Sequence, residues 1–182
     1  MCKDFCDSLY VDDVFVASND LGFVDSLFQY LQSRYQMKIV ANPKVFVGIQ
    51  LQYSSDGSTV FLNQEKYITK MAKTFSLDCG TVHSTPMEEG LRIEISKEIN
   101  DDSKFRAFIG SLLYIARHTR PDIYYAVNKL SRHQGHVTSE IFNYARRIGR
   151  YLYNTRDKSL PYTRDNSDTI NAFVDAAHAT EE

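Results

Sequence analysis

Tryptophan is absent from the sequence, and cysteine and proline are scarce, with three and four residues in a chain of 182. Three cysteines are too few for a disulfide framework, which favours a reducing compartment. No apolar run approaches the roughly 18 residues that a membrane-spanning helix needs. The N-terminus lacks a basic stretch followed by an apolar core, so no secretory signal is expected. The composition, 43% hydrophobic and 24% charged, is typical of a soluble globular protein.

Residues that could ligate a metal through sulfur or imidazole are also few. Cys2 and Cys6 are spaced like Cys79 and His83, so a zinc site is one interpretation of these four residues. The spacing is loose, however, and ordinary packed or exposed thiols are the default interpretation.

Charge is distributed unevenly, although the formal net charge is only −2. Residues 1–102 carry 9 basic and 15 acidic side chains, and residues 165–182 carry 5 acidic and no basic ones. Residues 103–164 carry 12 basic and 3 acidic side chains. The positively charged middle segment is suited to contacts with phosphates, and the acidic first segment is suited to binding a metal ion. A helical region with solvated Lys and Arg explains the same pattern equally well.

Apolar patterns predict two hairpins and two helices in the first part of the chain. Residues 8–16 form two apolar runs split by a pair of aspartates, and residues 45–62 alternate apolar and polar side chains around a turn at 54–58. Helical spacing of apolar residues predicts helices over 20–35 and 64–75.

The second part is predicted to be mostly helical after an acidic loop at 78–102. An apolar stripe predicts a helix over 103–117, Thr119 is expected to cap a helix to about residue 133, and Thr138 to cap another to about residue 154. The tyrosines at helical spacing are candidates for stacking on bases, but most of them are interpreted as core-edge residues. They are Tyr114, Tyr124, Tyr125, Tyr144, Tyr151 and Tyr153. Two short strands are expected at the end of the chain, at residues 160–164 and 169–174.

Asp12 and Asp13, at the turn of the first hairpin, are the main candidates for chemistry. Nucleotide transfer uses two divalent cations about 4 Å apart, and carboxylates on a rigid hairpin can hold such ions. Asp-Asp is also a common turn dipeptide, because aspartate supports turn conformations. An isolated Tyr-x-Asp-Asp is therefore weak evidence for catalysis.

A series of further motifs makes the pattern specific. The segment Leu9-Tyr10-Val11-Asp12-Asp13 followed by Ala17-Ser18-Asn19 is similar to the catalytic strand-turn-strand of copia-type retrotransposon reverse transcriptases. The resemblance continues, in order and over nearly the whole chain, through Phe46-Val47-Gly48-Ile49-Gln50, Leu62-Asn63-Gln64, Lys66-Tyr67-Ile68, Thr85-Pro86-Met87, Ile109-Gly110-Ser111-Leu112-Leu113-Tyr114, Thr119-Arg120-Pro121-Asp122-Ile123, Leu130-Ser131-Arg132 and Arg150-Tyr151-Leu152.

The resemblance implies roles for the residues at matching positions. Asp12 and Asp13 would be two of three polymerase ligands for Mg²⁺ or Mn²⁺, and Tyr10 would support the primer terminus or the incoming deoxynucleotide. The hairpin over residues 45–62 would hold the primer end, with Phe46 and Gly48 at the nucleic acid. The helices after residue 103 would be the thumb and connection that grip an RNA/DNA primer–template duplex.

The basic residues of this predicted thumb are the candidates for phosphate contacts. A polymerase must bind any sequence, and phosphates are alike at every step of a duplex. About half of the candidates are expected to face nucleic acid, and Arg120 has Asp122 as a local ion-pair alternative. The candidates are Arg106, Arg117, Arg120, Lys129, Arg132, Arg146, Arg147 and Arg150.

Departures from the family pattern predict that the chain is inactive by itself. The third palm carboxylate and the nucleotide-binding fingers would have to precede residue 1. Residues 156–182 resemble the start of a ribonuclease H domain, in which Asp175 matches a metal ligand, but Ala177 replaces the next aspartate. Gly149 stands where the family has an apolar helix residue. The parent protein would be intracellular, in a virus-like particle.

Together these patterns predict an α+β fold in three parts: a partial palm over residues 1–77, an acidic loop and basic helical thumb over 78–155, and an unfinished β segment over 156–182. Three hypotheses stay open at this point: a fragment of an RNA-directed DNA polymerase, a non-enzymatic nucleic-acid-binding module, and a translated remnant without a stable fold. Replacing both aspartates with Ala should leave duplex binding largely intact under either of the first two hypotheses. Only the polymerase hypothesis predicts metal-dependent chemistry that the replacement abolishes.

Overall fold

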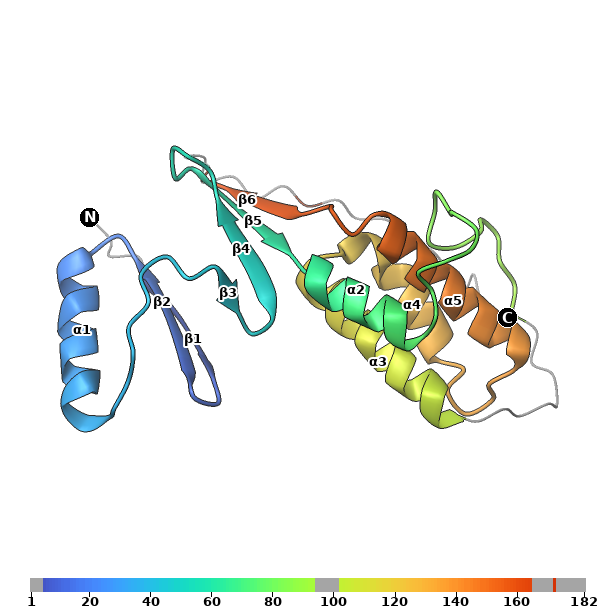
Figure 1. The fold of residues 1–182 in the computed structure, drawn as a ribbon, viewed down its shortest axis with the longest axis horizontal. Coiled ribbons are helices and arrows are strands. Elements are labelled where there is room, and N and C mark those ends of the chain that lie inside the picture. The colour runs from blue at the N-terminus through green and yellow to red at the C-terminus, as the bar shows by residue number, and fades with distance from the viewer. Residues whose placement is uncertain (1–4, 94–101, 165–171, 173–182) are drawn as a thin grey trace.

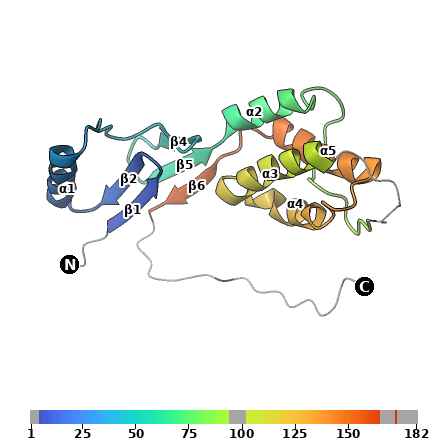
Figure 2. The same cartoon turned by 90° about the horizontal axis from the view of Figure 1, so that it is seen from below.

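The computed structural model of the chain describes residues 5–93, 102–164 and 172. Across them the molecule is elongated: a hairpin and one helix form one end, a small sheet lies in the middle, and helices form the other end (Figure 1 and Figure 2). Antiparallel strands beside separate helices confirm the predicted α+β class. The elements are β1 (Phe5–Tyr10), β2 (Asp13–Ser18), α1 (Leu21–Arg34), β3 (Val45–Phe46), β4 (Ile49–Tyr53), β5 (Thr59–Asn63), α2 (Glu65–Thr74), α3 (Asp102–His118), η1 (Pro121–Ile123), α4 (Tyr124–Ser131), α5 (Ser139–Asn154) and β6 (Leu160–Thr163).

The first hairpin forms as predicted. β1 and β2 pair antiparallel with Tyr10 opposite Asp13, which leaves Val11 and Asp12 as a two-residue turn. Val11 has a φ of 52° and Asp12 does not have a positive φ, the pattern of a type II′ turn. Because a β-branched residue rarely adopts a positive φ, the paired strands hold this turn against the preference of Val11. The following helix α1 begins after Asp20, as predicted from the capping residue.

The prediction of one continuous strand over residues 45–53 is wrong, because the chain reverses at Val47 and Gly48. β3 and β4 pair with Phe46 opposite Ile49. Both turn residues have a positive φ, 47° for Val47 and 77° for Gly48, as a type I′ turn requires. A two-residue turn leaves the alternation of apolar residues in phase, so the pattern gave no sign of the reversal.

The strand predicted at residues 160–164 forms as β6, and it joins the sheet of the first part of the chain. β6 pairs antiparallel with β5, with Leu160 opposite Leu62, and completes a sheet in the order β3-β4-β5-β6. The expectation of a separate, unfinished β segment is therefore wrong for residues 160–163, which extend the sheet of the predicted palm. The strand predicted at 169–174 lies outside the described residues except Ala172, which is not in a strand.

We call α2, α3, η1, α4 and α5 the helical unit. Thr138 caps α5 as predicted, its Oγ1 accepting a hydrogen bond from the Ile141 backbone N at 3.2 Å. The predicted helix from Thr119 to residue 133 is instead a 3-10 turn followed by the shorter α4. Thr119 does not cap it, because its hydroxyl donates to Gln64 Oε1 at 2.7 Å inside the unit.

The hydrophobic core lies in the helical unit. All buried hydrophobic residues of the described chain fall between Ile68 and Leu152. No residue from Cys6 to Leu62 is buried. Full burial of a Leu, Ile or Phe side chain contributes about 1.5–3 kcal/mol, so the helical unit supplies most of the stabilisation and the hairpin end relies on strand pairing. Among the described helices, none combines the length and the apolar character needed to cross a bilayer.

Candidate functional site

The first candidate is the hairpin tip, by which we mean Tyr10, Val11, Asp12 and Asp13. The strand register places both aspartates at the end of the hairpin, one in the turn and one at the first position of β2. All four side chains are exposed, and Tyr10 and Val11 are 57% and 80% accessible. The tip therefore presents two adjacent carboxylates to solvent on a backbone that the ladder holds in place.

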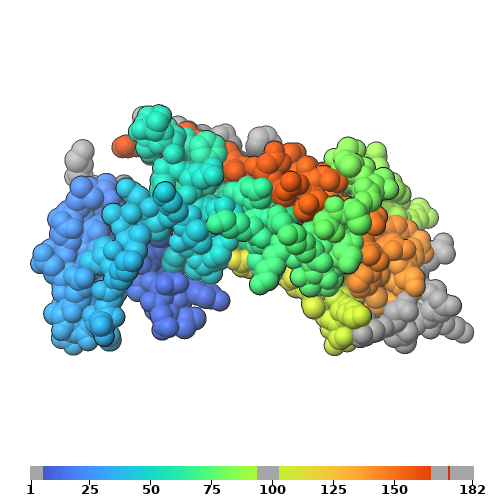
Figure 3. All heavy atoms as spheres, in the orientation of Figure 1, coloured from blue at the N-terminus to red at the C-terminus, as the bar shows by residue number. Residues whose placement is uncertain are grey.

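The hairpin tip lies beside the β3–β4 turn, which is Val47 and Gly48. The Phe15 and Phe46 rings pack with centroids 5.2 Å apart, joining β2 to β3. Burial is the main cause that raises the pKa of Tyr114, and the neighbouring Tyr67 and Tyr10 phenols add to it. In Figure 3 the outline of the molecule is hollowed between the dark blue hairpin and the yellow α3, and Figure 1 shows the β3–β4 turn on the same side. The tip thus faces a space that α3 closes on its other side.

The two carboxylates of the tip are ligands of the kind that a divalent cation takes. Carboxylate oxygens are the ligands that Mg²⁺ and Mn²⁺ prefer, and Mg²⁺ is commonly held by one or two carboxylates together with water and substrate phosphates. Asp12 and Asp13 fit that requirement. Within the described ranges no group of three or more His, Cys, Asp or Glu residues is placed to hold a metal, so these residues offer two carboxylates and no third.

Three of the predicted phosphate-contacting residues are exposed on the helical unit. Arg106 and Arg117 lie on α3, and Arg132 directly follows α4. Arg106 and Arg117 are separated by three helical turns, so both project from one face of α3, about 16 Å apart along its axis. Arg117 is in the last turn of α3, one turn beyond Tyr114. This face combines positive charge with closeness to the hollow.

The predicted arginines of α5 are packed beneath the loop that follows α2. Arg147 donates to Glu88 Oε1 at 2.5 Å and to Thr85 Oγ1 at 3.3 Å. A Cβ on Gly80 would lie 3.2 Å from the Arg150 guanidinium. In the described part of the chain, the Nε atoms of Arg146, Arg147 and Arg150 are buried and have no hydrogen-bond partner. Figure 1 shows this loop on the far side of the helical unit from the hairpin tip.

Lys129 is half-buried on the same far side. Its Nζ donates to the Leu91 carbonyl at 2.8 Å. It also lines a cavity of about 650 Å³ between the loop and α4, whose other walls include Glu88, Glu89 and Asp122. The mixed charge of this cavity and its place away from the hairpin tip distinguish it from the site at the hollow.

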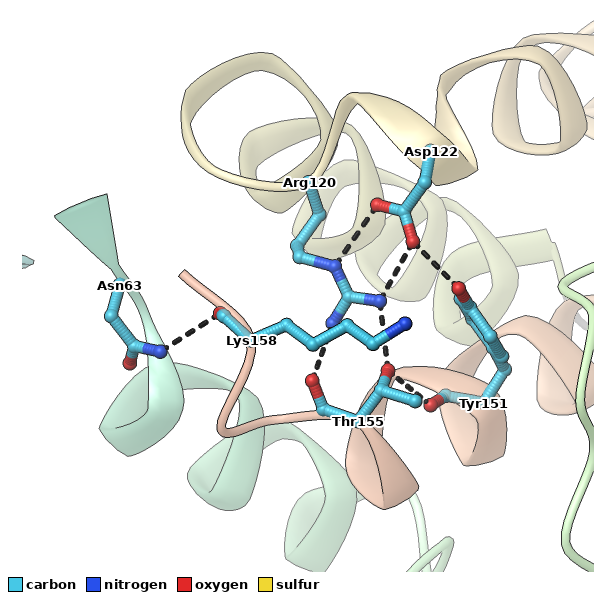
Figure 4. A network of polar contacts seen from close by, with 6 residues as sticks. All are labelled: Asn63, Arg120, Asp122, Tyr151, Thr155 and Lys158. Carbon is cyan, nitrogen blue, oxygen red and sulfur yellow. Dashed lines mark hydrogen bonds and ion pairs between the residues drawn. The ribbon is translucent and has the colours of Figure 1, made fainter. Parts of the chain in front are cut away.

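The prediction that Arg120 contacts phosphate is wrong, because Arg120 is 2% exposed, and the alternative ion pair with Asp122 is confirmed. Its Nε and Nη2 donate to the two Asp122 oxygens at 2.9 and 2.8 Å (Figure 4). Its Nη1 donates to the Thr155 carbonyl at 2.9 Å, and Nη2 also donates to Thr155 Oγ1 at 2.7 Å. The Tyr151 hydroxyl completes the group by donating to Asp122 Oδ2 at 2.7 Å. The Thr-Arg-Pro-Asp motif is thus an internal clamp between η1 and the end of α5.

The contacts of the clamp shift the pKa of Asp122. Burial acts to raise the pKa of Asp122, but the hydrogen bonds from Arg120 and Tyr151 outweigh it and hold the pKa below its ordinary value. Burial and the neighbouring carboxylate raise the pKa of Tyr151, so its hydroxyl stays protonated and donating. Beside the clamp, Asn63 Nδ2 donates to the Lys158 carbonyl at 2.9 Å, which ties the segment before β6 to the end of β5 (Figure 4).

The sequence did not predict the hydroxyl contacts of two tyrosines. Tyr114 and Tyr151 were interpreted as core-edge residues, yet each uses its hydroxyl in a defined contact, Tyr114 with the Val47 carbonyl and Tyr151 with Asp122. Both lie within motifs that resemble the family, and that was the one signal available. Phe46, predicted at the nucleic acid, is half-buried against Phe15, whereas Gly48 is exposed at the turn.

The remaining sequence candidates are not brought together. Cys6 and Cys79 are exposed free thiols, and Cys2 lies outside the described residues. The zinc interpretation therefore gains no support among the residues that the structure describes. Asp175 also lies outside the described residues, so a ribonuclease H start with a metal ligand there stays a prediction.

Comparison with known proteins agrees with the family resemblance. Residues 3–89 match the family described as reverse transcriptase (RNA-dependent DNA polymerase). The putative transposon Ty5-1 protein of Saccharomyces cerevisiae is 31% identical over 173 residues, which cover 94% of this chain and 56% of that protein. The retrovirus-related Pol polyprotein from transposon RE2 of Arabidopsis thaliana is 31% identical over 171 residues, covering 92% of this chain and 12% of the polyprotein. No solved structure matches the chain.

An uncharacterized mitochondrial protein of Arabidopsis thaliana is 32% identical over 170 residues, 92% of this chain and 69% of that protein. The chain spans only part of its transposon relatives, 56% of the yeast protein and 12% of the plant polyprotein. The matched residues nevertheless include the hairpin tip, the four-stranded sheet and the helical unit. The chain belongs to the reverse transcriptases of Ty/copia-type retrotransposon Pol polyproteins.

Proposed function

We propose that this chain carries the catalytic hairpin and a duplex-binding surface of an RNA-directed DNA polymerase, with Asp12 and Asp13 holding Mg²⁺ or Mn²⁺ at a primer end. The position of the hairpin tip supports this: two exposed carboxylates border the same hollow as the β3–β4 turn. In the parent enzyme two bound divalent ions would activate the primer hydroxyl and neutralise the triphosphate. Tyr10 would support the primer terminus or the incoming deoxynucleotide, and Gly48 would let the turn approach the primer closely.

The exposed arginines of the helical unit would contact the phosphates of the primer–template duplex. Arg106 and Arg117 share one face of α3, and Arg117 lies toward the end of α3 that meets the β3–β4 turn. A guanidinium binds phosphate without reading sequence, as a polymerase requires. Arg120, inside the clamp, is not part of this surface.

Metal binding at the tip is tested with Mn²⁺ as a paramagnetic probe of backbone amide signals. Mn²⁺ is expected to broaden the amide signals of residues 10–14 selectively in the full chain. The double change Asp12→Asn and Asp13→Asn should abolish this broadening. Asp56→Asn is the matched control, because Asp56 is also an exposed turn aspartate but its carboxylate accepts from the Ser58 backbone N at 3.1 Å. Broadening that survives the double change would refute the metal site.

Duplex binding is tested by fluorescence anisotropy of a labelled primer–template at several salt concentrations. Replacing Arg106 and Arg117 with Gln should weaken binding and lower the slope of log K against log salt by about 2, one unit for each lost phosphate contact. Arg34→Gln, on α1 at the opposite end of the molecule, is the control. An unchanged slope would show that α3 does not face the duplex.

The metal and duplex tests also separate the two functional hypotheses. A non-enzymatic binding module predicts salt-sensitive duplex binding with no Mn²⁺ effect at the tip, whereas the polymerase proposal predicts both. With two carboxylates and no third among the described residues, we expect no primer extension by the chain alone with Mg²⁺, primed RNA and deoxynucleotides. Templated extension above background would contradict that expectation.

A further inference from the structure

The Tyr114 hydroxyl connects the helical unit to the β3–β4 turn. Tyr114 lies on α3, and its hydroxyl donates to the Val47 carbonyl at 2.5 Å. A Cβ on Gly48 would lie 3.1 Å from the same oxygen, so the turn backbone sits directly against the phenol. Both turn residues hold a positive φ. A conformation that Val rarely adopts persists only where its surroundings favour it.

Neighbouring side chains hold the Tyr114 ring in place. The Tyr67 ring packs edge-on with its centroid 4.9 Å from that of Tyr114. The centroid of the His118 ring, one turn further along α3, is 4.6 Å away. His118 Nδ1 is 2.7 Å from the Tyr114 carbonyl. The Gln64 side chain lies beside the phenol, and Thr119 fixes that amide from inside the unit. The ring is thus positioned by α2 and α3, while its hydroxyl reaches the turn.

We propose that Tyr114 is a positioning residue, whose hydroxyl fixes the β3–β4 turn to the end of α3 so that the turn and the duplex-binding face of α3 keep a constant separation. An effect of this contact on the position of a bound primer end rests on the function proposed above. The coupling of the turn to α3 does not rest on it. A turn that carries no buried residue of its own is otherwise held by two ladder pairs. Removing the hydroxyl should therefore loosen the turn selectively, without disturbing the core.

The test is hydrogen exchange, followed by mass spectrometry, in the full chain carrying Tyr114→Phe. This change keeps the ring and removes only the hydroxyl. Peptides covering residues 44–51 should exchange about 3- to 10-fold faster, as loss of one hydrogen bond implies, while peptides of α3 and α5 stay unchanged. Tyr67→Phe is the matched control, since it removes a neighbouring phenol oxygen that donates no hydrogen bond to the turn among the described residues, and it should leave the exchange unchanged.

A second readout uses a primer–template with 2-aminopurine at the primer 3′ end. Tyr114→Phe should change the fluorescence of this terminal base on binding, while the overall Kd changes less than 2-fold. Unchanged exchange at residues 44–51, or equal acceleration throughout the chain, would overturn the coupling. If wild-type chain fails to bind the duplex, the proposed function fails, and the exchange result still decides the coupling. Faster exchange with an unaltered primer-end signal would overturn the role in primer placement.

Discussion

The clamp around Arg120 allows a quantitative test of what stabilises the helical unit. Asp122→Asn keeps the shape of the side chain but leaves the guanidinium of the buried Arg120 without its counter-charge. Removing one partner of a fully buried ion pair costs about 3–5 kcal/mol. The Asp122 side chain is 38% exposed, so water already screens part of the interaction. We therefore expect the free energy of unfolding to fall by about 2–3 kcal/mol.

The reciprocal change and the double change isolate the pair. Arg120→Met removes the guanidinium and its bonds to Thr155, and we expect a loss of about 2–4 kcal/mol. The double variant should lose less than the sum of the single losses, by about 1–2 kcal/mol, because the second change no longer breaks an intact pair. Urea unfolding followed by circular dichroism at 222 nm at pH 7 measures all three. Asp157→Asn, an exposed aspartate after α5, is the control.

Acid adds an independent check on the same carboxylate. The pKa of Asp122 in the folded chain lies below its ordinary value of 3.8. Its contribution is therefore complete above pH 3.8 and is lost as the pH falls through the lower folded value. Asp122→Asn should remove the contribution of this carboxylate to the fall in the free energy of unfolding at acidic pH. A loss under about 0.5 kcal/mol in the Asn variant, or strictly additive single losses, would refute the view that the clamp stabilises the unit.

Two further predictions concern α5 and the loop above it. Gly149→Ala should destabilise the chain by about 1–2 kcal/mol in the same urea assay, because a Cβ there would collide with Leu77 and lie 2.9 Å from Phe108 Cζ. Helix propensity alone predicts a gain in stability instead, and such a gain would refute the tight packing at Gly149. Burial, then the nearby Arg147 and Arg150, lower the pKa of His83 below 6.5, so stability should fall as the pH drops below 6.5. In the His83→Gln variant, the urea midpoint of unfolding should change less between pH 7.5 and pH 5.5 than it does in the wild-type chain. An equal change in both chains would contradict this.

Local patterns predicted the elements whose signals lie close together along the chain. The first hairpin, α1, α2, α3 and α5 follow from apolar periodicity and from the caps at Asp20 and Thr138. These features depend on interactions within a few residues, so they can be recognised without knowing the fold. The ordered motifs also placed the chain in its family, because together they specify far more than any one of them.

Contacts between distant segments could not be predicted in this way. The pairing of β6 with β5 joins residues about 100 positions apart, and neither strand carries a mark of its partner. The local pair of Arg120 with Asp122 was an alternative given from sequence, but its burial and its bonds to Thr155, 35 residues away, were not, because a buried guanidinium finds its remaining acceptors in the tertiary packing. Residue type shows that a side chain can donate a hydrogen bond, whereas the tertiary packing decides which acceptor it meets.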